Sequence, residues 1–334
     1  MTPGEPGPTT QGRLLLEGVW RRVRLLVIQP ADYPHTGAFA ELIDSLFHAF
    51  TALGAVADIA ENEPLAGEGV NIVFGAHLLP FVPRLPNLPH NSVIFNLEQL
   101  KHGAFQERSA YAHLLRSFPI WDYSQRNVAL CQAIAGHQNV HQLRLGYMPQ
   151  MTRIPPSPVK NVDVLFYGTV NDRRRAILES LTRSGLNVET LTGVYGEARD
   201  AFIARAKIVL NIHFYDDKIH ELTRTSYLLA NRKLVVSECD HETEIEDDIK
   251  SAIIAATYDR LVPTCLALVQ ADPERAALEE RGFGIFSRRD QVDYLLSATS
   301  TTSIPTPAMK DIGAASLGTS MTSAPTCPRG GLSS

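Results

Sequence analysis

Residues 207–238 read KIVLNIHFYDDKIHELTRTSYLLANRKLVVSE, and this stretch decides the fold. A continuous apolar run at 208–212 is typical of a β-strand that is buried on both faces. A polar loop at 213–218 and a helical pattern through Ala230 lead to a second apolar run at 234–236. In such a βαβ unit the two strands are parallel, and the loop lies at the carboxyl edge of the sheet, where open α/β sheets bind ligands.

The same alternation of strands and helices extends on both sides of this stretch. The predicted strands are 23–29, 55–59, 70–74, 92–96, 120–123 and 141–146, then 162–167, 188–191, 208–212, 234–236 and 253–255. Residues 147–160 are rich in proline and lack any period, which is typical of a linker. We therefore predict an α/β fold with two Rossmann-like domains, residues 22–146 and 161–298, that face each other across a cleft.

The two ends of the chain have a different composition. Residues 1–21 are rich in Pro, Gly and Thr, and residues 299–334 consist largely of Ser, Thr, Pro and Gly. Segments with so few apolar side chains cannot offset the entropy lost on ordering. We expect both to be disordered, and a single helical stretch at 273–298 to end the second domain.

Charge and cysteine content narrow the class of protein. The chain has 31 basic and 36 acidic residues and a net charge of −5, which argues against nucleic acid or a membrane surface as partner. No apolar run approaches the roughly 20 residues of a transmembrane helix, and the start of the chain lacks a signal-peptide pattern. The four cysteines are scattered, without CxxC spacing, so we expect no disulfide framework and no metal site. The sequence predicts a cytoplasmic protein.

A first candidate binding segment follows the predicted strand 162–167. Gly168 and Thr169 form the loop, where a glycine lets the backbone approach a ligand closely. Arg173 stands beside the free N–H groups of the next helix, an arrangement that suits a phosphate. Arg174 and Arg175 are interpreted as a solvated face of that helix.

The loop and helix of residues 213–230 carry the second candidate set. Lys218, Glu221 and Arg224 recur every third residue, so they are predicted to share one helix face near its start. A carboxylate there suits the hydroxyls of a ribose or sugar, and the cations suit a diphosphate. The competing interpretation is an exposed ladder of salt bridges. His213 and Tyr215 are expected to contact ligand from the loop, and Ser226 to pack in the helix or offer a hydroxyl contact.

In the first half, His77 and Glu98 each follow a predicted strand. Neighbouring strands would bring both to the cleft, where a carboxylate or imidazole can act as acid or base. The alternative for Glu98 is an ordinary surface position. The sequence has no Ser-His-Asp spacing, HExxH, P-loop or nucleophile elbow, which disfavours hydrolases and NTPases.

Residues 163–238 resemble the carboxyl half of bacterial glycosyltransferases of the two-Rossmann (GT-B) fold, of the group 1 and spore-protein-like types. The resemblance is carried by DVLFYG (163–168), RRR (173–175), GVYG (193–196), AKIVLN (206–211) and residues 221–238. It implies a nucleotide-sugar site in this half, with the diphosphate bound by basic side chains and helix N-termini and without an essential metal. The two glutamates of the group 1 pattern are replaced by Lys218 and Ser226, so Glu221 is our substitute for the ribose-binding carboxylate.

These observations predict a glycosyltransferase that moves a sugar from a nucleotide-diphosphate donor to a hydroxyl of a glycan, lipid or small-molecule acceptor, without a cofactor. Glu98 or His77 would accept the proton if the reaction inverts the anomeric configuration. Two alternatives stay open: a nucleotide-sugar epimerase of the same fold, and a non-catalytic module that binds nucleotide-sugars.

Overall fold

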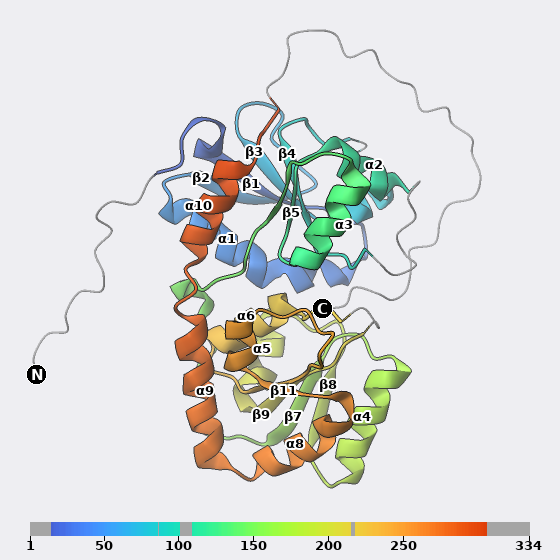
Figure 1. Cartoon of the computed structure of the whole chain (residues 1–334), viewed down its shortest axis with the longest axis vertical. Coiled ribbons are helices and arrows are strands. Elements are labelled where there is room, and N and C mark those ends of the chain that lie inside the picture. The colour runs from blue at the N-terminus through green and yellow to red at the C-terminus, as the bar shows by residue number, and fades with distance from the viewer. Residues whose placement is uncertain (1–14, 86, 101–108, 215–217, 306–334) are drawn as a thin grey trace, which may run out of the picture.

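The computed structural model describes residues 15–85, 87–100, 109–214 and 218–305, which form two α/β units stacked along the long axis (Figure 1). The first unit contains a parallel sheet with strand order β2-β1-β3-β4-β5-β6, and the second a parallel sheet with order β11-β10-β9-β7-β8. The predicted α/β fold with two Rossmann-like units is confirmed.

The strand bounds follow the apolar runs of the sequence closely. In the first sheet they are β1 Arg22–Val27, β2 Val56–Glu61, β3 Val70–Phe74, β4 Ser92–Asn96, β5 Ile120–Asp122 and β6 Val140–Gln142. In the second they are β7 Val162–Tyr167, β8 Val188–Leu191, β9 Ala206–Asn211, β10 Val235–Glu238 and β11 Ile254–Ala256. Every residue of β3, β4 and β10 is buried, because helices cover both faces of each sheet.

The helices lie on both faces of the sheets. Their bounds are α1 Ala40–Ala52, α2 Ala110–Ser117, α3 Gln125–Ala135, α4 Asp172–Arg183, α5 Gly196–Arg205, α6 Leu222–Ala230, α7 Asp247–Ala252, α8 Leu261–Val269, α9 Asp272–Phe286 and α10 Gln291–Thr301. In the second unit α4 and α8 share one apolar cluster, whereas α5, α6, α7 and α9 share another that continues into the first unit. This continuous core holds the two units together.

The carboxyl ends of the strands in the two sheets face each other. Ser124, just after β5, donates its hydroxyl to Glu244, which follows β10, at 2.5 Å. Arg199 on α5 donates to Glu41 on α1 at 2.6 Å. The loops at both carboxyl edges, which carry the candidate residues, are therefore brought to one interface.

The end of the described chain differs from the sequence prediction. The helical stretch expected at 273–298 is divided into α9 and α10, and α10 returns to pack on α1 of the first unit (Figure 1). Thr302, expected to lie in a disordered tail, is buried and accepts a hydrogen bond from Trp121 Nε1 at 2.7 Å. The expected helix is confirmed at 291–298, but the prediction was wrong for the break at 287–290 and for residues 299–302. Residues 306–334 lie outside the described part of the chain.

The start of the described chain is also part of the fold. Trp20, in the short 3-10 helix Gly18–Arg21, stacks on Trp121 with ring centroids 5.7 Å apart and on Phe50 at 6.4 Å. Leu16 N–H donates to Leu53 O at 3.0 Å. The predicted disorder of residues 1–21 is wrong for residues 16–21, because two buried apolar side chains outweigh the Pro- and Gly-rich sequence before them. Residues 1–14 are not described.

We predict that Trp20→Ala lowers the free energy of unfolding by about 3 kcal/mol or more, because it removes a buried aromatic side chain and leaves a cavity. Urea unfolding measures this loss. The neighbouring, exposed Val19→Ala is the matched control and should change it by less than about 0.5 kcal/mol. Equal effects of the two substitutions would contradict the packing of this segment.

Candidate functional site

The loop after β7 is closed by a capped helix. Gly168 has φ 128°, a conformation that favours glycine. Asn171 is the N-cap of α4, and its Oδ1 accepts the Arg174 N–H at 3.0 Å. Asp172 is the first helical residue. Thr169 contributes its carbonyl oxygen, which accepts from Arg174 Nη1 at 2.8 Å. Gly168 and Thr169 are partly exposed at the interface edge of the second unit.

Arg174 is completely buried, so its interpretation as a solvated residue was wrong. Its guanidinium donates to Ile212 O from Nε at 2.9 Å and from Nη2 at 2.6 Å, and to Glu221 Oε1 at 2.7 Å. Burial lowers the pKa of Arg174 to about 10, which leaves it charged at neutral pH. Arg174 therefore joins the loop after β7, the end of β9 and the start of α6.

Glu221 lies between two buried arginines. It is the N-cap residue of α6 and is 3% exposed. Oε1 pairs with Arg174, and Oε2 lies 2.9 Å from Arg224 Nη2. Burial opposes its ionisation, but the charges of Arg224 and Arg174 hold the pKa of Glu221 below its ordinary value. Because both oxygens face guanidinium groups, this carboxylate orders the arginines.

Arg224 has hydrogen-bonding capacity left over. Its Nη1 donates to Asn211 Oδ1 at 2.9 Å, and its guanidinium lies over the ring of Tyr167, 4.9 Å from the centroid. Its Nε and Nη2 are buried without an aligned hydrogen-bond acceptor among the described residues. The same holds for Nε2 of the buried His213. Unsatisfied buried donors are costly, so these atoms suit an anionic or strongly polar ligand.

Arg173 lies at the start of α4 and is held by side chains of the second unit. It makes a bidentate pair with Glu238, which ends β10, and stacks on Tyr258 with 4.1 Å between its Cζ and the ring centroid. Its side chain is 29% exposed. The pairing fixes its direction while leaving part of the guanidinium accessible.

One of the predicted donor-side residues, Lys218, differs from its expected place, whereas Ser226 packs in the helix as expected. Lys218 precedes α6 instead of sharing its face, and its Nζ pairs with Asp240 and, at 3.0 Å, with Glu242. Ser226 is buried within α6 and donates to Thr223 O at 3.0 Å. Tyr215 lies outside the described residues. The helix starts later than predicted because residues 218–220 pair with the loop after β10.

The structure brings His77 and Glu98 together, as the neighbouring strands β3 and β4 predict. His77 Nδ1 lies 3.5 Å from Glu98 Oε1. Burial raises the pKa of Glu98 to about 8 and lowers the pKa of His77 to about 4, so both are mainly uncharged at neutral pH. The backbone of Glu98 is held by the amides of Asn96 and Asn127, which donate to its carbonyl oxygen at 2.9 and 3.0 Å.

Tyr123 and Glu244 complete the interface. Tyr123 is partly buried. Burial raises its pKa, and carboxylates of both units, among them Asp122, Glu221, Glu244 and Glu98, raise it further. Glu244 accepts from Ser124 Oγ and from the Arg126 N–H, at the start of α3. The polar run after β5 points to Tyr123 and Ser124, but no sequence motif marks Glu244. Its contact joins residues 120 positions apart.

Two further findings concern the described residues alone. No group of three or more His, Cys, Asp or Glu side chains among them is arranged to hold a metal ion. In the same part of the chain, no helix has the length and apolar content needed to cross a membrane.

Known sequences give limited help. No protein-family model matches the chain. One uncharacterised protein of Acanthamoeba polyphaga mimivirus is 30% identical over 177 residues, which are 52% of this chain and 24% of that protein. A second from the same virus is 28% identical over 179 residues, 53% of this chain and 58% of that protein. The chain thus spans about a quarter of the length of the first relative and somewhat over half of the length of the second.

Solved structures show the fold. Anabaena HepE in complex with UDP-glucose superposes with a TM-score of 0.56 and 13% identity, over 83% of this chain and 98% of HepE. A mutant of T4 phage BGT in complex with UDP-glucose gives a TM-score of 0.55 and 12% identity, over 84% of this chain and 99% of BGT. WaaG, a glycosyltransferase involved in lipopolysaccharide biosynthesis, gives a TM-score of 0.51 and 13% identity, over 84% of this chain and 99% of WaaG. The chain therefore has the GT-B fold of these proteins.

We predict that Glu221→Ala lowers the free energy of unfolding by about 3–5 kcal/mol, because it leaves two buried guanidinium groups without their shared counter-charge. Chemical denaturation at neutral pH measures this loss. Glu197→Ala, which removes an exposed carboxylate from the first turn of α5, is the control and should have a much smaller effect. A loss no larger than that of the control would show that Glu221 does not hold the two arginines.

Proposed function

We propose that this protein is a glycosyltransferase that moves a sugar from a nucleotide-diphosphate donor to an acceptor hydroxyl. The observation that carries the proposal is the meeting of two different chemistries at one interface. Arginines at the carboxyl edge of the second sheet suit a diphosphate, and a carboxyl–imidazole pair at the carboxyl edge of the first sheet suits a hydroxyl. The UDP-glucose complexes of HepE and BGT, which share the fold, support this assignment.

On the donor side, the backbone of Gly168 and Thr169 would approach the phosphates, and Arg173 and Arg224 would supply positive charge. The Nε of Arg224, which has no hydrogen-bond acceptor among the described residues, is the donor best placed for the diphosphate, and Nη2 lies beside it in the ion pair with Glu221. His213 would offer its Nε2 to the donor. We propose that these groups stabilise the leaving diphosphate without an essential metal.

Glu221 takes a different part from the one expected from the sequence. Its carboxylate is enclosed by Arg174 and Arg224, so we propose that it positions Arg224 and does not bind the ribose. Lys218 is proposed to bind the donor only at the outer edge of the site, because its ammonium group is paired with Asp240 and Glu242. Ser226 would act through the packing of α6.

On the acceptor side, the hydroxyl oxygen would form a bond to the anomeric carbon of the sugar while the bond from that carbon to the diphosphate breaks. The diphosphate leaves with the electron pair, and the ionised carboxylate of Glu98 takes the hydroxyl proton. His77 lies 3.5 Å away and would orient Glu98 or receive the proton in its place. The burial that raises the pKa of Glu98 also makes its carboxylate a stronger base.

A non-catalytic nucleotide-sugar-binding module is the second candidate. One observation favours it: Arg173 pairs with Glu238, and Arg224 pairs with Glu221. These carboxylates within the chain weaken the electrostatic attraction of the arginines for a diphosphate. Binding of a nucleotide-sugar without turnover would favour this module over the transferase. An epimerase would instead interconvert the donor sugar without any acceptor.

The proposal is tested with a panel of UDP-, GDP-, ADP- and dTDP-sugars. The full chain is incubated with each, and release of the nucleoside diphosphate is followed by a coupled assay. We expect one nucleotide class to bind, to raise the melting temperature and to be turned over, by slow hydrolysis or by transfer. Binding of none of these donors would contradict the proposed function.

We predict that Arg173→Ala weakens binding of that nucleotide diphosphate about 10- to 100-fold, because it removes charge-assisted hydrogen bonds worth roughly 1.5–3 kcal/mol. Calorimetric titration with the nucleoside diphosphate measures the change. Arg175→Ala is the matched control, since Arg175 is exposed on the same helix and pairs with Asp172. If Arg173→Ala and Arg175→Ala bind equally well, the diphosphate does not lie at Arg173.

The pKa of Glu98 predicts the pH dependence of turnover. A general base must be ionised, so kcat/KM should rise about tenfold per pH unit below about pH 8 and level off above it. Glu98→Gln should remove this pH dependence and lower kcat by about 10²–10⁴-fold, whereas the exposed Glu68→Gln should change neither. An unaltered pH profile in Glu98→Gln would exclude Glu98 as the base.

A further inference from the structure

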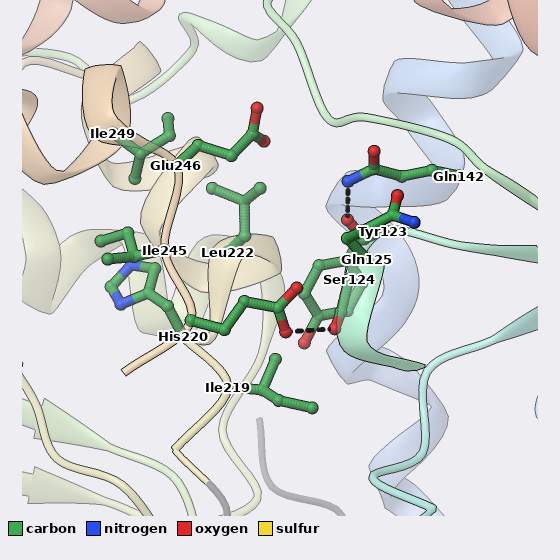
Figure 2. A pocket seen from close by; sticks show the side chains of 11 residues that line it. Tyr123, Ser124, Gln125, Gln142, Ile219, His220, Leu222, Ile245, Glu246 and Ile249 are labelled. Carbon is green, nitrogen blue, oxygen red and sulfur yellow. Dashed lines mark hydrogen bonds between the residues drawn. The ribbon is translucent and has the colours of Figure 1, made fainter. Parts of the chain in front are cut away.

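A cavity lies between the two units (Figure 2). It is beside the arginine cluster, which is the group of Arg174 and Arg224 around Glu221. The volume of the cavity is about 120 Å³, and it is partly open to solvent. Its apolar wall comes from both units and consists of Tyr123, Ile219, Leu222, Ile245 and Ile249. Figure 2 shows Tyr123 on the side of the first unit, opposite Leu222 and Ile249.

The polar groups around this cavity do not favour an anion. No lysine or arginine is among the described residues that line it. It has two carboxylates instead, and both are already hydrogen-bonded: Glu244 to Ser124 and Glu246 to Arg144 and Arg289. Burial lowers the pKa of His220 to about 3, so its imidazole is neutral. The polar side chains left to meet a ligand are mainly amides.

The cavity adjoins both halves of the proposed chemistry. Leu222 follows Glu221 in the chain, so this wall directly continues the arginine cluster. On the opposite wall, Tyr123 follows Asp122, whose carboxyl oxygen accepts from Asn96 at 2.6 Å. Asn96 in turn holds the backbone of Glu98. No arginine lines the cavity, but neighbouring residues in the chain and the hydrogen bonds of Asn96 connect its two walls to Glu221 and to Glu98.

We propose that this cavity binds the acceptor, and that the acceptor is a neutral hydroxyl compound with an apolar body, such as a phenol or a hydrophobic alcohol, and not a phosphorylated glycan or a nucleic acid. The apolar wall would bury the body, and the amides of Gln125 and Gln142 would contact polar atoms at the rim. This inference rests on the proposed glycosyltransferase function and names its second substrate class.

Two probes of similar ring size separate the charge classes: 2-naphthol, which is neutral, and 2-naphthyl phosphate, which is anionic. Binding to the full chain is followed by naphthyl fluorescence in the presence of saturating nucleoside diphosphate. We expect 2-naphthol to bind at least tenfold more tightly than its phosphate and, with the preferred nucleotide-sugar, to be converted to a naphthyl glycoside. Equal or tighter binding of the phosphate would overturn the proposal.

The location is tested with Ile245→Trp, which places a large side chain in the cavity from a loop. This substitution should weaken the binding of 2-naphthol at least tenfold, while the nucleoside diphosphate binds as before. Val159→Trp, at an exposed linker position, is the matched control and should bind both normally. If Ile245→Trp does not fold, Gln125→Trp narrows the same cavity from an exposed helix position. Unchanged 2-naphthol binding in a folded cavity variant would overturn the proposal.

Failure of this inference and failure of the proposed function give different results. Donor turnover together with no binding of 2-naphthol would reject the acceptor class and leave the transferase in place. Binding of 2-naphthol that Ile245→Trp abolishes, without turnover of any nucleotide-sugar, would support the cavity as a site for neutral apolar molecules and reject the transferase.

Discussion

The arrangement of the site depends on one buried carboxylate, Glu221, placed between Arg174 and Arg224. Two guanidinium groups without solvent would repel each other, so the shared counter-charge allows both to be buried at the start of α6. The other N–H groups of Arg174 donate to backbone carbonyls that follow β7 and β9. In Arg224, by contrast, Nε and Nη2 have no aligned hydrogen-bond acceptor among the described residues. One arginine thus builds the edge of the sheet, and the other is left to bind.

The same interface fixes the two units on both sides of α6. On one side Arg199 pairs with Glu41, and the ring of Tyr195 packs so closely on Gly37 that an added Cβ would lie 2.8 Å from it. On the other side Glu244 receives hydrogen bonds from Ser124 and from the start of α3. These contacts hold the units close together. The division into a charged face and a neutral pocket is what assigns different ligands to the two places.

Local patterns in the sequence were sufficient for the sheets and for several details. The run DVLFYG predicts β7 at its observed bounds, and Ser124 caps α3 as its position indicates. Patterns cannot tell which of three consecutive arginines faces the core, so Arg174 was assigned to solvent although tertiary contacts bury it. Spacing alone placed Lys218 on the helix, whereas pairing with the loop after β10 delays the start of α6. The packing of α10 on α1 and the hydrogen bond between Glu244 and Ser124 join residues that are distant in the sequence, and no short motif encodes such contacts.

The most direct test of the central claim is a crystal structure of the full chain with the nucleoside diphosphate it binds. We predict that phosphate oxygens lie within hydrogen-bonding distance of Arg224 Nε or Nη2, with Arg173 and the backbone of residues 168–169 beside them and Glu221 still between Arg174 and Arg224. A diphosphate bound away from Arg224, with its Nε still without a hydrogen-bond acceptor, would contradict the claim that α6 presents the donor site.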